Sequence, residues 1–333
     1  MKTTTTAGQV IKPLEVLSKV DELHEAGLQR GHSTGWPGMD EYMTLKLGTT
    51  FYIYGQPFSG KSEWWFEVLV NATCLEGWKH AIFSPETGQA HNIVAELISK
   101  FAGKPFYSNL QGSITKEELY KWANYIDHHF LILDAKEDEP LTFDDLIRLT
   151  DDWENDYGKI HTLTIDPWNE LTHDFWSEDG GRQDIYLEKA LGRFRRNAIK
   201  RNRINCIITH ISDQQLIEKD GKRFYPKPTP RQIAGGQAYY RKGMNMIGVW
   251  RPPVGLLDDK GRPYEQNEVI LDVSKFKPKG VGKKGEHTMF FDAHRNAYYE
   301  IGTLQHQYAI RDRLTYQAKT QMLPNPNTDD LPF

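Results

Sequence analysis

The chain has 333 residues, of which 26% are charged and 38% hydrophobic, as expected of a globular protein and not of a disordered or fibrous one. The formal net charge of −4 argues against a protein that coats nucleic acid over its whole surface, but it allows a local basic channel. The two cysteines are far apart and have no metal-ligand residues at short spacing, so neither a disulfide framework nor a zinc site is supported.

No apolar run approaches the length of a membrane span. The segment "MKTTTTAGQVIK" lacks both the apolar core of a secretory signal and the Arg-rich pattern of an organellar transit peptide. We therefore expect a cytoplasmic compartment and no membrane partner. Cys74 and Cys206 are expected to be buried thiols of the core.

Residues 12–27 are predicted to form a helix that precedes the main fold. Pro13 suits the first turn, and Gly27 can take the left-handed conformation that ends a helix. Val16, Val20 and Leu23 lie on one face, which makes the segment amphipathic.

From residue 51 onward, short apolar runs alternate with helical patterns. The predicted strands are "FYIY" (51–54), "HAIFS" (80–84), "FLILDA" (130–135), "HTLTID" (161–166) and "NCIITHIS" (205–212). The helical patterns cover residues 61–74, 87–103, 115–127, 143–156 and 183–202. This alternation is typical of an α/β fold in which helices flank a mostly parallel sheet.

The pattern changes after residue 240, where helical segments become rare. The runs "NMIGVW", "EVILDVSKF", "HTMFFDA" and "AYYEIG" predict strands that continue through an antiparallel extension. The final stretch "QMLPNPNTDDLPF" is rich in Pro and Asn and is expected to be disordered. We expect an N-terminal arm with its helix at 1–30, one main domain at 31–303 and a C-terminal segment at 304–333.

The stretch "GQPFSGKS" matches G-x-x-x-x-G-K-[ST], a phosphate-binding loop (P-loop), and stands between a predicted strand and a predicted helix. Backbone N–H groups of such a loop can surround a phosphate chain, while Lys61 can reach its β- and γ-phosphates and the Ser62 hydroxyl can bind Mg²⁺. Of the two tryptophans that follow, at least one is expected to pack against the sheet. The predicted nucleotide-binding residues here are Gly55, Gln56, Pro57, Phe58, Ser59, Gly60, Lys61, Ser62 and Glu63.

Hydrolysis also requires a metal carboxylate and a water-activating carboxylate at neighbouring strand ends. Asp166 ends the run "TLTID" and is predicted to serve Mg²⁺, while Glu86 follows "AIFSP" and is the candidate for water activation. His210 closes "NCIITH", where a hydrogen bond can sense the γ-phosphate. The alternatives are helix caps for the two acidic residues and a purely structural role for the histidine.

The order of these parts resembles RecA-type ATPases and, within them, the replicative hexameric helicases of the DnaB and Twinkle kind. The resemblance covers roughly residues 10–300 and rests on "STGWPGMDEY", "GQPFSGKSEW", "FSPETG", "LTIDPWNEL", "QDIYLEKALGRFRRNAIKRNRINCIITH", "RQIAGGQAYYRKGMNMIGVWR" and "SKFKPKGVGKKGEHTMFFD". It implies a RecA-like P-loop ATPase core that uses ATP and Mg²⁺. It also implies a homo-oligomeric ring, expected to be a hexamer, that moves 5′ to 3′ on single-stranded DNA.

The resemblance implies a role for each strand-end residue. In that family the carboxylate in the place of Glu86 polarises the attacking water, and the one in the place of Asp166 serves Mg²⁺. A polar residue in the place of His210 reads the γ-phosphate. With Lys61, these roles agree with those expected from the strand ends alone.

A Lys-x-Arg pair from a neighbouring subunit reaches the γ-phosphate in these helicases. The matching residues here are Lys275 and Lys277, which are therefore the candidate catalytic residues supplied by a second chain. Since lysine lacks the planar fork of arginine, Lys279 or Arg251 are alternatives, and Arg251 is also a candidate nucleotide-binding residue. The two lysines are otherwise expected to line a solvated strand.

DNA contacts in this family come from loops that face the central hole of the ring. By position these are residues 172–183, which are acidic, and residues 233–243, which combine glycines with cations. The basic run "GRFRRNAIKRNR" is either a further contact or a solvated helix face. The candidate DNA-binding residues are Gly235, Gly236, Gln237, Arg241 and Lys242.

Two terminal segments acquire possible partners from the resemblance. The helix at 12–27 matches a linker helix that packs on the adjacent subunit, the alternative being packing on its own domain. Since neither a primase-like domain nor a helical collar is recognised, we expect a minimal motor from a bacterial or phage-infected cell.

The ending "NTDDLPF" resembles the acidic tip of bacterial single-stranded-DNA-binding proteins. A contact with replication proteins, or alternatively a featureless end, is predicted for Asp329, Asp330, Leu331, Pro332 and Phe333.

Three functions are compatible with this core. The leading one is an ATP-dependent, ring-forming replicative DNA helicase. The alternatives are a RecA-like recombination ATPase that binds single-stranded DNA in filaments, and a non-motor loading or regulatory ATPase. "IDPWNEL" and "SKFKPKG" favour the helicase.

Overall fold

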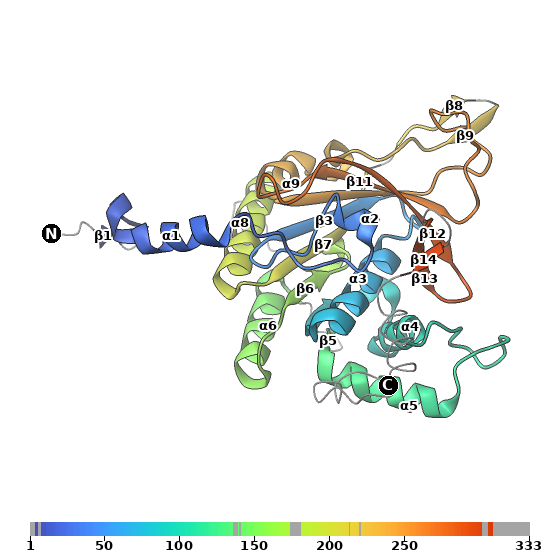
Figure 1. Cartoon of the computed structure of the whole chain (residues 1–333), viewed down its shortest axis with the longest axis horizontal. Coiled ribbons are helices and arrows are strands. Elements are labelled where there is room, and N and C mark those ends of the chain that lie inside the picture. The colour runs from blue at the N-terminus through green and yellow to red at the C-terminus, as the bar shows by residue number, and fades with distance from the viewer. Residues whose placement is uncertain are drawn as a thin grey trace.

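A computed structural model gives the fold of most of the chain (Figure 1). It describes residues 4–5, 8–135, 139, 141–173, 181–212, 214–219, 221–301 and 306–308. Within these ranges, no helix has the length and apolar character needed to cross a bilayer. The body is built around one ten-stranded sheet.

One part of this sheet is parallel, as the alternation of strands and helices predicts. The parallel strands are β3 (Thr50–Gly55), β4 (His80–Phe83), β5 (Phe130–Leu133), β6 (Thr162–Ile165), β7 (Ile204–His210) and β10 (Asn245–Trp250). Their order is β10-β3-β7-β6-β4-β5. Because all of them run in the same direction, their carboxyl ends share one edge of the sheet.

An antiparallel extension continues the sheet beyond β10, and its strands agree with the predicted runs. They are β11 (Glu268–Lys275), β12 (Gly285–Asp292), β13 (Ala297–Ile301) and β14 (His306–Tyr308). One expectation is correct only on one side of its strand: the run "NMIGVW" forms β10, which pairs with β11 antiparallel as predicted but with β3 in parallel. The apolar pattern of a buried strand does not reveal its direction, and a short crossover helix before β10 was not predicted.

Helices cover both faces of the sheet and agree closely with the predicted ranges. One face carries α3 (Lys61–Glu76), α4 (Ala90–Ala102) and α5 (Lys116–His129). The other carries α6 (Phe143–Tyr157), α8 (Gln183–Arg201) and the crossover helix α9 (Gly236–Lys242). Thr115 and Thr142 start α5 and α6 with capping boxes, which satisfy backbone N–H groups that a helix start leaves unpaired.

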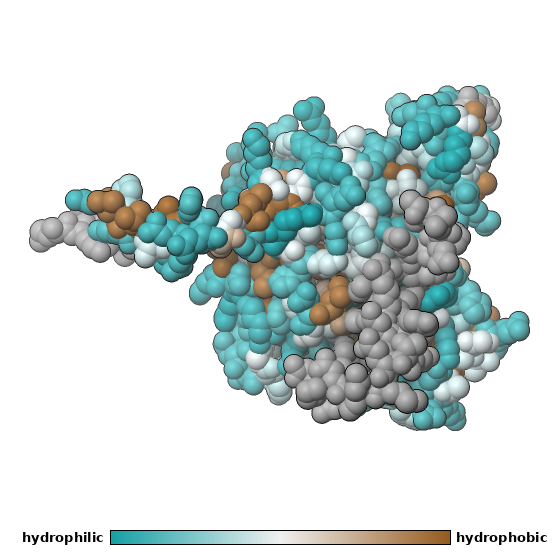
Figure 2. Space-filling model, viewed as in Figure 1, coloured by the Kyte–Doolittle hydropathy of each residue, from teal (hydrophilic) through white to brown (hydrophobic). Residues whose placement is uncertain are grey.

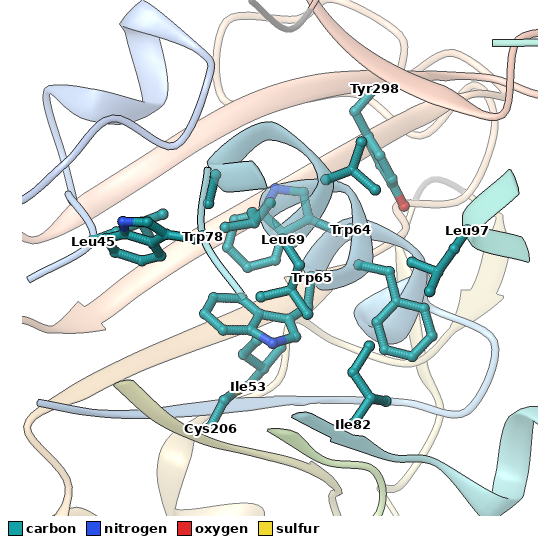
Figure 3. Packing of buried hydrophobic residues seen from close by; sticks show 14 of the residues in the cluster. Leu45, Ile53, Trp64, Trp65, Leu69, Trp78, Ile82, Leu97, Cys206 and Tyr298 are labelled. Carbon is teal, nitrogen blue, oxygen red and sulfur yellow. The ribbon is translucent and has the colours of Figure 1, made fainter. Parts of the chain in front are cut away.

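The core on the α3 face is rich in aromatic side chains (Figure 3). Trp64 and Trp65 are both fully buried, so the expectation that at least one packs against the sheet is confirmed. The indole Nε1 of Trp65 donates to the Thr164 hydroxyl on β6 at 2.9 Å. Alternate residues of β3 serve the two faces, with Phe51 in this cluster and Tyr52 in the cluster beneath α8, as expected for a strand covered on both sides. Cys74 and Cys206 are buried free thiols.

The predicted N-terminal helix forms as a 3₁₀ turn, η1 (Pro13–Val16), followed by α1 (Leu17–Ala26). Gly27 ends it with a φ of 66°. None of its residues is buried, and it projects away from the body, so it does not pack on its own domain (Figure 1). Its apolar side chains form a visible band in Figure 2. The exposed apolar residues of the helix are Leu14, Leu17, Val20 and Leu23, and Val10 and Ile11 are exposed just before it.

Short elements complete the description. They are β1 (Thr4–Thr5), β2 (Gly8–Gln9), α2 (Pro37–Asp40), η2 (Pro85–Thr87), η3 (Trp168–Glu170), β8 (Ile217–Lys219), β9 (Lys222–Phe224) and η4 (Pro230–Gln232). Of these, η2 follows the end of β4 and contributes to the site described next.

Candidate nucleotide-binding site

The P-loop lies where the sequence places it, between the end of β3 and the start of α3. Its two motif glycines are required by geometry. A Cβ on Gly55 would lie 2.4 Å from the Val249 carbonyl oxygen, and one on Gly60 would lie 2.6 Å from the Tyr298 hydroxyl. Gly60 also has a φ of 89°, which side chains disfavour. The Tyr298 hydroxyl donates to the Gly60 carbonyl at 3.2 Å and so supports the loop from β13.

The loop side chains between the glycines differ in their surroundings. Phe58 stands at the tip, 97% exposed, and adopts a φ of 60° that is unusual for a residue with a side chain. Pro57 is exposed beside it. Ser59 is buried, and its hydroxyl has no hydrogen-bond partner among the described residues. A buried polar atom of this kind is expected to gain a partner when ligand binds.

Lys61 begins α3, and its side chain lies buried under the loop. Its ammonium donates to the Gln56 carbonyl oxygen at 2.9 Å. Burial lowers the pKa of Lys61 to about 8, although the negative charges of Asp166 and Glu86 oppose this shift. An anion placed at the loop would stabilise the charged form of this lysine.

The other predicted catalytic residues lie at the ends of the strands next to β3. His210 ends β7, Asp166 directly follows β6, and Glu86 lies on η2 after β4. These strands are neighbours in the order β3-β7-β6-β4. The topology therefore brings the side chains to one edge, as the strand-end rule predicts.

Asp166 is only 1% exposed, and the Ser84 hydroxyl donates to its Oδ2 at 3.0 Å. Burial raises its pKa, while hydrogen bonds from Ser62 and Ser84 oppose the rise. A buried carboxylate beside the Ser62 hydroxyl is a donor set that suits Mg²⁺, which prefers oxygen ligands and keeps several waters. A divalent cation would also offset the cost of burying the charge. The two residues therefore fit the predicted metal role.

His210 connects Lys61 with Glu86. Its Nδ1 lies 3.4 Å from Lys61 Nζ, and its Nε2 lies 2.9 Å from Glu86 Oε2. Because an ammonium can only donate, Nδ1 accepts and the proton on Nε2 is donated to the carboxylate. The histidine thus bridges the lysine that would hold phosphate and the half-exposed carboxylate that would polarise water.

Arg251 follows β10 and lines a cavity of about 680 Å³ beside the P-loop. Phe58, Gly60 and Glu63 form the P-loop side of this cavity. Phe291 also lines the cavity, and the Arg251 guanidinium lies 5.9 Å from its ring centroid. Arg251 is therefore a neighbour of its own P-loop, and its role as a nucleotide-binding residue stays a prediction.

Lys275 and Lys277 lie at the opposite edge of the sheet. Lys275 is aligned with Met246 at the start of β10, and the Lys277 backbone N–H donates to Asn245 Oδ1 at 2.9 Å. Met246 is aligned with Tyr52 on β3, whereas the P-loop begins at Gly55, where β3 ends. Since a strand rises about 3.3 Å per residue, these lysines lie roughly 10 Å or more from their own P-loop. They are not brought together with the strand-end residues of the same chain.

The cations at this opposite edge influence one another. The Lys275 ammonium donates to the Tyr240 carbonyl and lies 4.7 Å from the centroid of its ring. Burial lowers the pKa of Lys275, and neighbouring positive charges lower it further. These charges belong to Lys277, Arg195 and Lys284. Arg195, on α8, was missed because it lies in a basic run that sequence reasoning could not resolve into a contact and a solvated face.

The candidate DNA-binding residues lie around the start of α9. Gly235 has a φ of 72°, and a Cβ on Gly236 would lie 2.7 Å from the Pro230 carbonyl oxygen. The local backbone therefore requires glycine at both positions, whether or not DNA binds there. Gln237, Arg241 and Lys242 are on or near the surface. Arg241 lies 3.4 Å from Glu188, which offsets part of its charge.

Two predicted segments extend beyond the part of the chain that the structure describes. Residues 174–180 of the first candidate DNA loop lie outside it, as does the proposed partner tail at 329–333. The predictions for both segments stay predictions, as do the domain boundaries and the cytoplasmic compartment.

Comparisons with known proteins agree with the motifs. No family model matches the chain. A Twinkle homolog protein, chloroplastic/mitochondrial, from Arabidopsis thaliana is 27% identical over 291 residues, which make up 85% of this chain and 38% of that protein. The chain therefore spans well under half the length of this relative.

Solved structures show the same architecture. A structure of an ATPase domain superposes with a TM-score of 0.66 at 14% identity, covering 87% of this chain and 99% of that one. A DnaB-like replicative helicase, solved to study its interactions with primase, also has a TM-score of 0.66 at 14% identity, covering 86% of this chain and 68% of that one. The chain therefore has the same fold as these ATPase domains. The predicted fold class and the resemblance to DnaB-like and Twinkle-like helicases are confirmed.

Proposed function

We propose that the chain is an ATP-dependent replicative DNA helicase that forms a ring and translocates on single-stranded DNA. The observation that supports it best is the connected set Lys61, His210 and Glu86, with Asp166 beside it, at adjacent strand ends of a RecA-like helicase fold. The set contains a group for each task of phosphoryl transfer to water.

The P-loop and Lys61 bind and orient the triphosphate, and Ser62 and Asp166 hold Mg²⁺, which would neutralise charge on the phosphate oxygens. Glu86 accepts a hydrogen bond from the attacking water and polarises it. His210 lies at the strand end that would face the γ-phosphate, and because its Nδ1 accepts from Lys61 in this structure, it would have to carry a proton on Nδ1 to donate to a phosphate oxygen in place of that contact. Such an exchange would report the presence of the γ-phosphate to the carboxylate that His210 also contacts.

The nucleoside is proposed to occupy the 680 Å³ cavity beside the P-loop. Its volume is within the usual range for small-ligand sites, and the aromatic face of Phe291 with the Arg251 guanidinium provides a surface on which a base can stack. The buried Ser59 hydroxyl, unpartnered among the described residues, supports a ligand in contact with this loop.

A ring, expected to be a hexamer, is supported by two features that a single chain leaves uncovered. The exposed apolar band of α1 is suited to packing on a neighbouring copy. Lys275, Lys277 and Arg195 present positive charge at the edge remote from their own P-loop, where a triphosphate bound to the next subunit can meet it. DNA is proposed to contact the α9 region at Gly235, Gly236 and Lys242.

Electron microscopy with ATP, combined with unwinding of a forked DNA substrate, tests this function. Closed rings that separate the strands of a fork with a free 5′ tail are the expected result. Open filaments without strand separation would instead indicate a recombination ATPase, and hydrolysis with neither rings nor unwinding would indicate a loading or regulatory ATPase. A protein that stays monomeric and inactive with nucleotide, magnesium and DNA would contradict the proposal.

The contact between the C-terminal tail and replication proteins is proposed separately. Deleting residues 329–333 should abolish pull-down of replication proteins, because the terminal aromatic and the adjacent acidic residues supply the recognised features. ATPase activity should not change. Unchanged pull-down would remove the tail from the proposal.

A further inference from the structure

Three glutamine side chains connect the P-loop with the turn that carries Gly235 and Gly236. Gln56, in the loop, donates through Nε2 to Gln214 Oε1 at 2.7 Å. Gln214 in turn donates through its own Nε2 to Gln232 Oε1 at 2.8 Å. All three side chains are partly buried, so water competes less with these bonds than it does at an open surface.

The direction of the donors in this chain is determined by the backbone. The backbone N–H of Thr229 points to Gln232 Oε1 at 2.7 Å. Since a backbone N–H can only donate, Gln232 must present its oxygen, and Gln214 must present its amide nitrogen to that oxygen. The oxygen of Gln214 then faces Gln56, which must donate. The orientation of each amide along the chain therefore follows from one unambiguous donor.

Gln232 is also connected to the segment that directly follows β7, the strand that ends in His210. Ile211, the next residue after His210, forms a bridge with Ile233, and the Ser212 backbone N–H donates to the Gln232 carbonyl oxygen at 2.6 Å. Gln232 thus receives one connection from the P-loop and one from the strand of the candidate γ-phosphate sensor.

On its far side, Gln232 leads into the candidate DNA-binding turn within a few residues. Its side chain closes the cap of η4 with Thr229. Ile233 is buried, and the Gly236 backbone N–H donates to its carbonyl oxygen at 2.6 Å. The start of the turn is therefore held by hydrogen bonds at Gln232 and Ile233, and through these bonds we expect a shift of Gln232 to reach Gly235.

We infer that Gln214 is a positioning residue that couples the state of the nucleotide site to the conformation of the Gly235–Gly236 turn. This inference rests on the proposed function, because it assigns a regulatory link between the two proposed binding sites. The coupling is reciprocal by thermodynamic necessity: if bound nucleotide changes the affinity for DNA, bound DNA changes the affinity for nucleotide by the same factor. Gln214 touches neither ligand in this scheme and acts through Gln56 and Gln232.

The test uses the full chain and a poly-dT oligonucleotide. ATPase activity is measured with and without the oligonucleotide, and DNA affinity is measured with a non-hydrolysable ATP analogue and with ADP. Gln214→Ala should leave DNA-free hydrolysis and its KM unchanged. It should lower both the DNA stimulation and the ratio of the two DNA affinities by about fivefold or more. Gln215→Ala is the matched control, since Gln215 is exposed and takes no part in these bonds.

Two glutamate variants test whether coupling depends on the hydrogen-bonded chain of Gln56, Gln214 and Gln232, here called the relay, or on a general effect of charge. Gln232→Glu keeps an oxygen that accepts from both Thr229 and Gln214, so coupling should be retained. Gln214→Glu still accepts from Gln56 but sets an oxygen against the Gln232 oxygen, so coupling should be lost as in Gln214→Ala. Each variant adds one negative charge to the same small region.

The inference is overturned if the two glutamate variants behave alike, or if Gln214→Ala keeps full DNA stimulation. In both cases the wild-type protein would still hydrolyse ATP in response to DNA, and the proposed function would stand. If the wild-type protein shows no nucleotide-dependent DNA binding, both the function and the relay are wrong.

Discussion

The two edges of the parallel sheet carry charge in different ways. At the carboxyl edge, Lys61 is surrounded by groups of its own chain, including His210 at 3.4 Å and the carboxylates that oppose the shift of its pKa. At the opposite edge, Lys275, Lys277 and Arg195 gather without an ion pair to any other described residue. At the carboxyl edge, the positive charge of Lys61 is accompanied by the negative charges of Asp166 and Glu86. At the opposite edge, the positive charges of the three cations lie close to one another.

The difference teaches which half of the chemistry a single chain contains. Binding and water activation need groups that are held in place beforehand, and the side chains proposed for these tasks at the carboxyl edge are held by hydrogen bonds within one chain. Stabilising charge that develops on a triphosphate needs further cations, and we propose that the opposite edge supplies them to the site of a neighbouring copy. The predictions below test this division, beginning with the largest effect.

Removing the water-activating carboxylate should have the largest effect. Glu86→Gln is expected to lower hydrolysis about 10²- to 10⁴-fold, because the amide cannot polarise water as a carboxylate does. Nucleotide binding should remain, whereas Lys61→Ala should abolish hydrolysis and weaken binding as well. Steady-state ATPase assays and binding of a fluorescent ATP analogue check both. Glu170→Gln, an exposed carboxylate after the neighbouring strand β6, serves as the control and should stay active.

Removing a cation from the opposite edge should have the next largest effect and should act on another subunit. Lys277→Ala is expected to lower hydrolysis about 10- to 100-fold, less than loss of an arginine finger, because lysine supplies charge without the planar fork. Mixing Lys277→Ala with Glu86→Gln should restore part of the activity, since some mixed interfaces then combine an intact Glu86 with an intact Lys277. An ATPase titration of the mixture measures this.

A mixture no more active than its two components would place Lys277 in its own chain's site and break the comparison between the edges. Arg195→Ala and Lys279→Ala sharpen it further. The variant with the larger loss identifies which cation takes the part that arginine has in the related helicases.

The DNA contacts should give a smaller, salt-dependent effect. Lys242→Ala is expected to reduce the slope of log affinity against log salt by about 0.7 for single-stranded DNA, because one phosphate contact is lost. Arg241→Ala should have less effect, since Glu188 at 3.4 Å already offsets its charge. Fluorescence anisotropy across a salt series measures both slopes. Lys121→Ala on α5 is the control, and an equal change there would remove α9 from the interface.

Two histidines that are largely buried should make the free energy of unfolding depend on pH in the acid range. Burial lowers the pKa of His80 well below its ordinary value of 6.5 and lowers that of His161 to about 4. The unfolded chain therefore binds protons that the folded chain does not, so the free energy of unfolding should fall as pH decreases from about 6.5 toward 4. Urea denaturation at several pH values measures the decrease.

His161→Asn should reduce this pH dependence, since the asparagine oxygen can still accept the Lys79 N–H but does not titrate. The exposed His128 supplies the control, because replacing it with Gln should leave the slope unchanged. A slope that survives in His161→Asn would assign the acid sensitivity to His80 or to other groups.

Sequence reasoning predicted the parallel core well because strand and helix periods alternate clearly there, and because strand ends share one edge. Glu86, Asp166 and His210 could be found in this way without knowledge of their contacts. The direction of β10 could not, since a strand buried on both faces reads the same in either direction. Gln214 and Arg195 also escaped prediction, because their partners come from distant segments and no local spacing marks them.

The hydroxyl of Tyr298 has a practical consequence for anyone who shortens this chain. This hydroxyl, on β13, donates to the Gly60 carbonyl oxygen. The backbone N–H of Tyr298 donates to Oε2 of the buried Glu67, on α3, at 2.8 Å. A strand near the C-terminal end of the sheet thus supports a loop that lies more than 200 residues earlier in the chain. An expression fragment that stops before residue 297 should retain every motif of the nucleotide site and still bind nucleotide poorly, because nothing would brace the loop from behind.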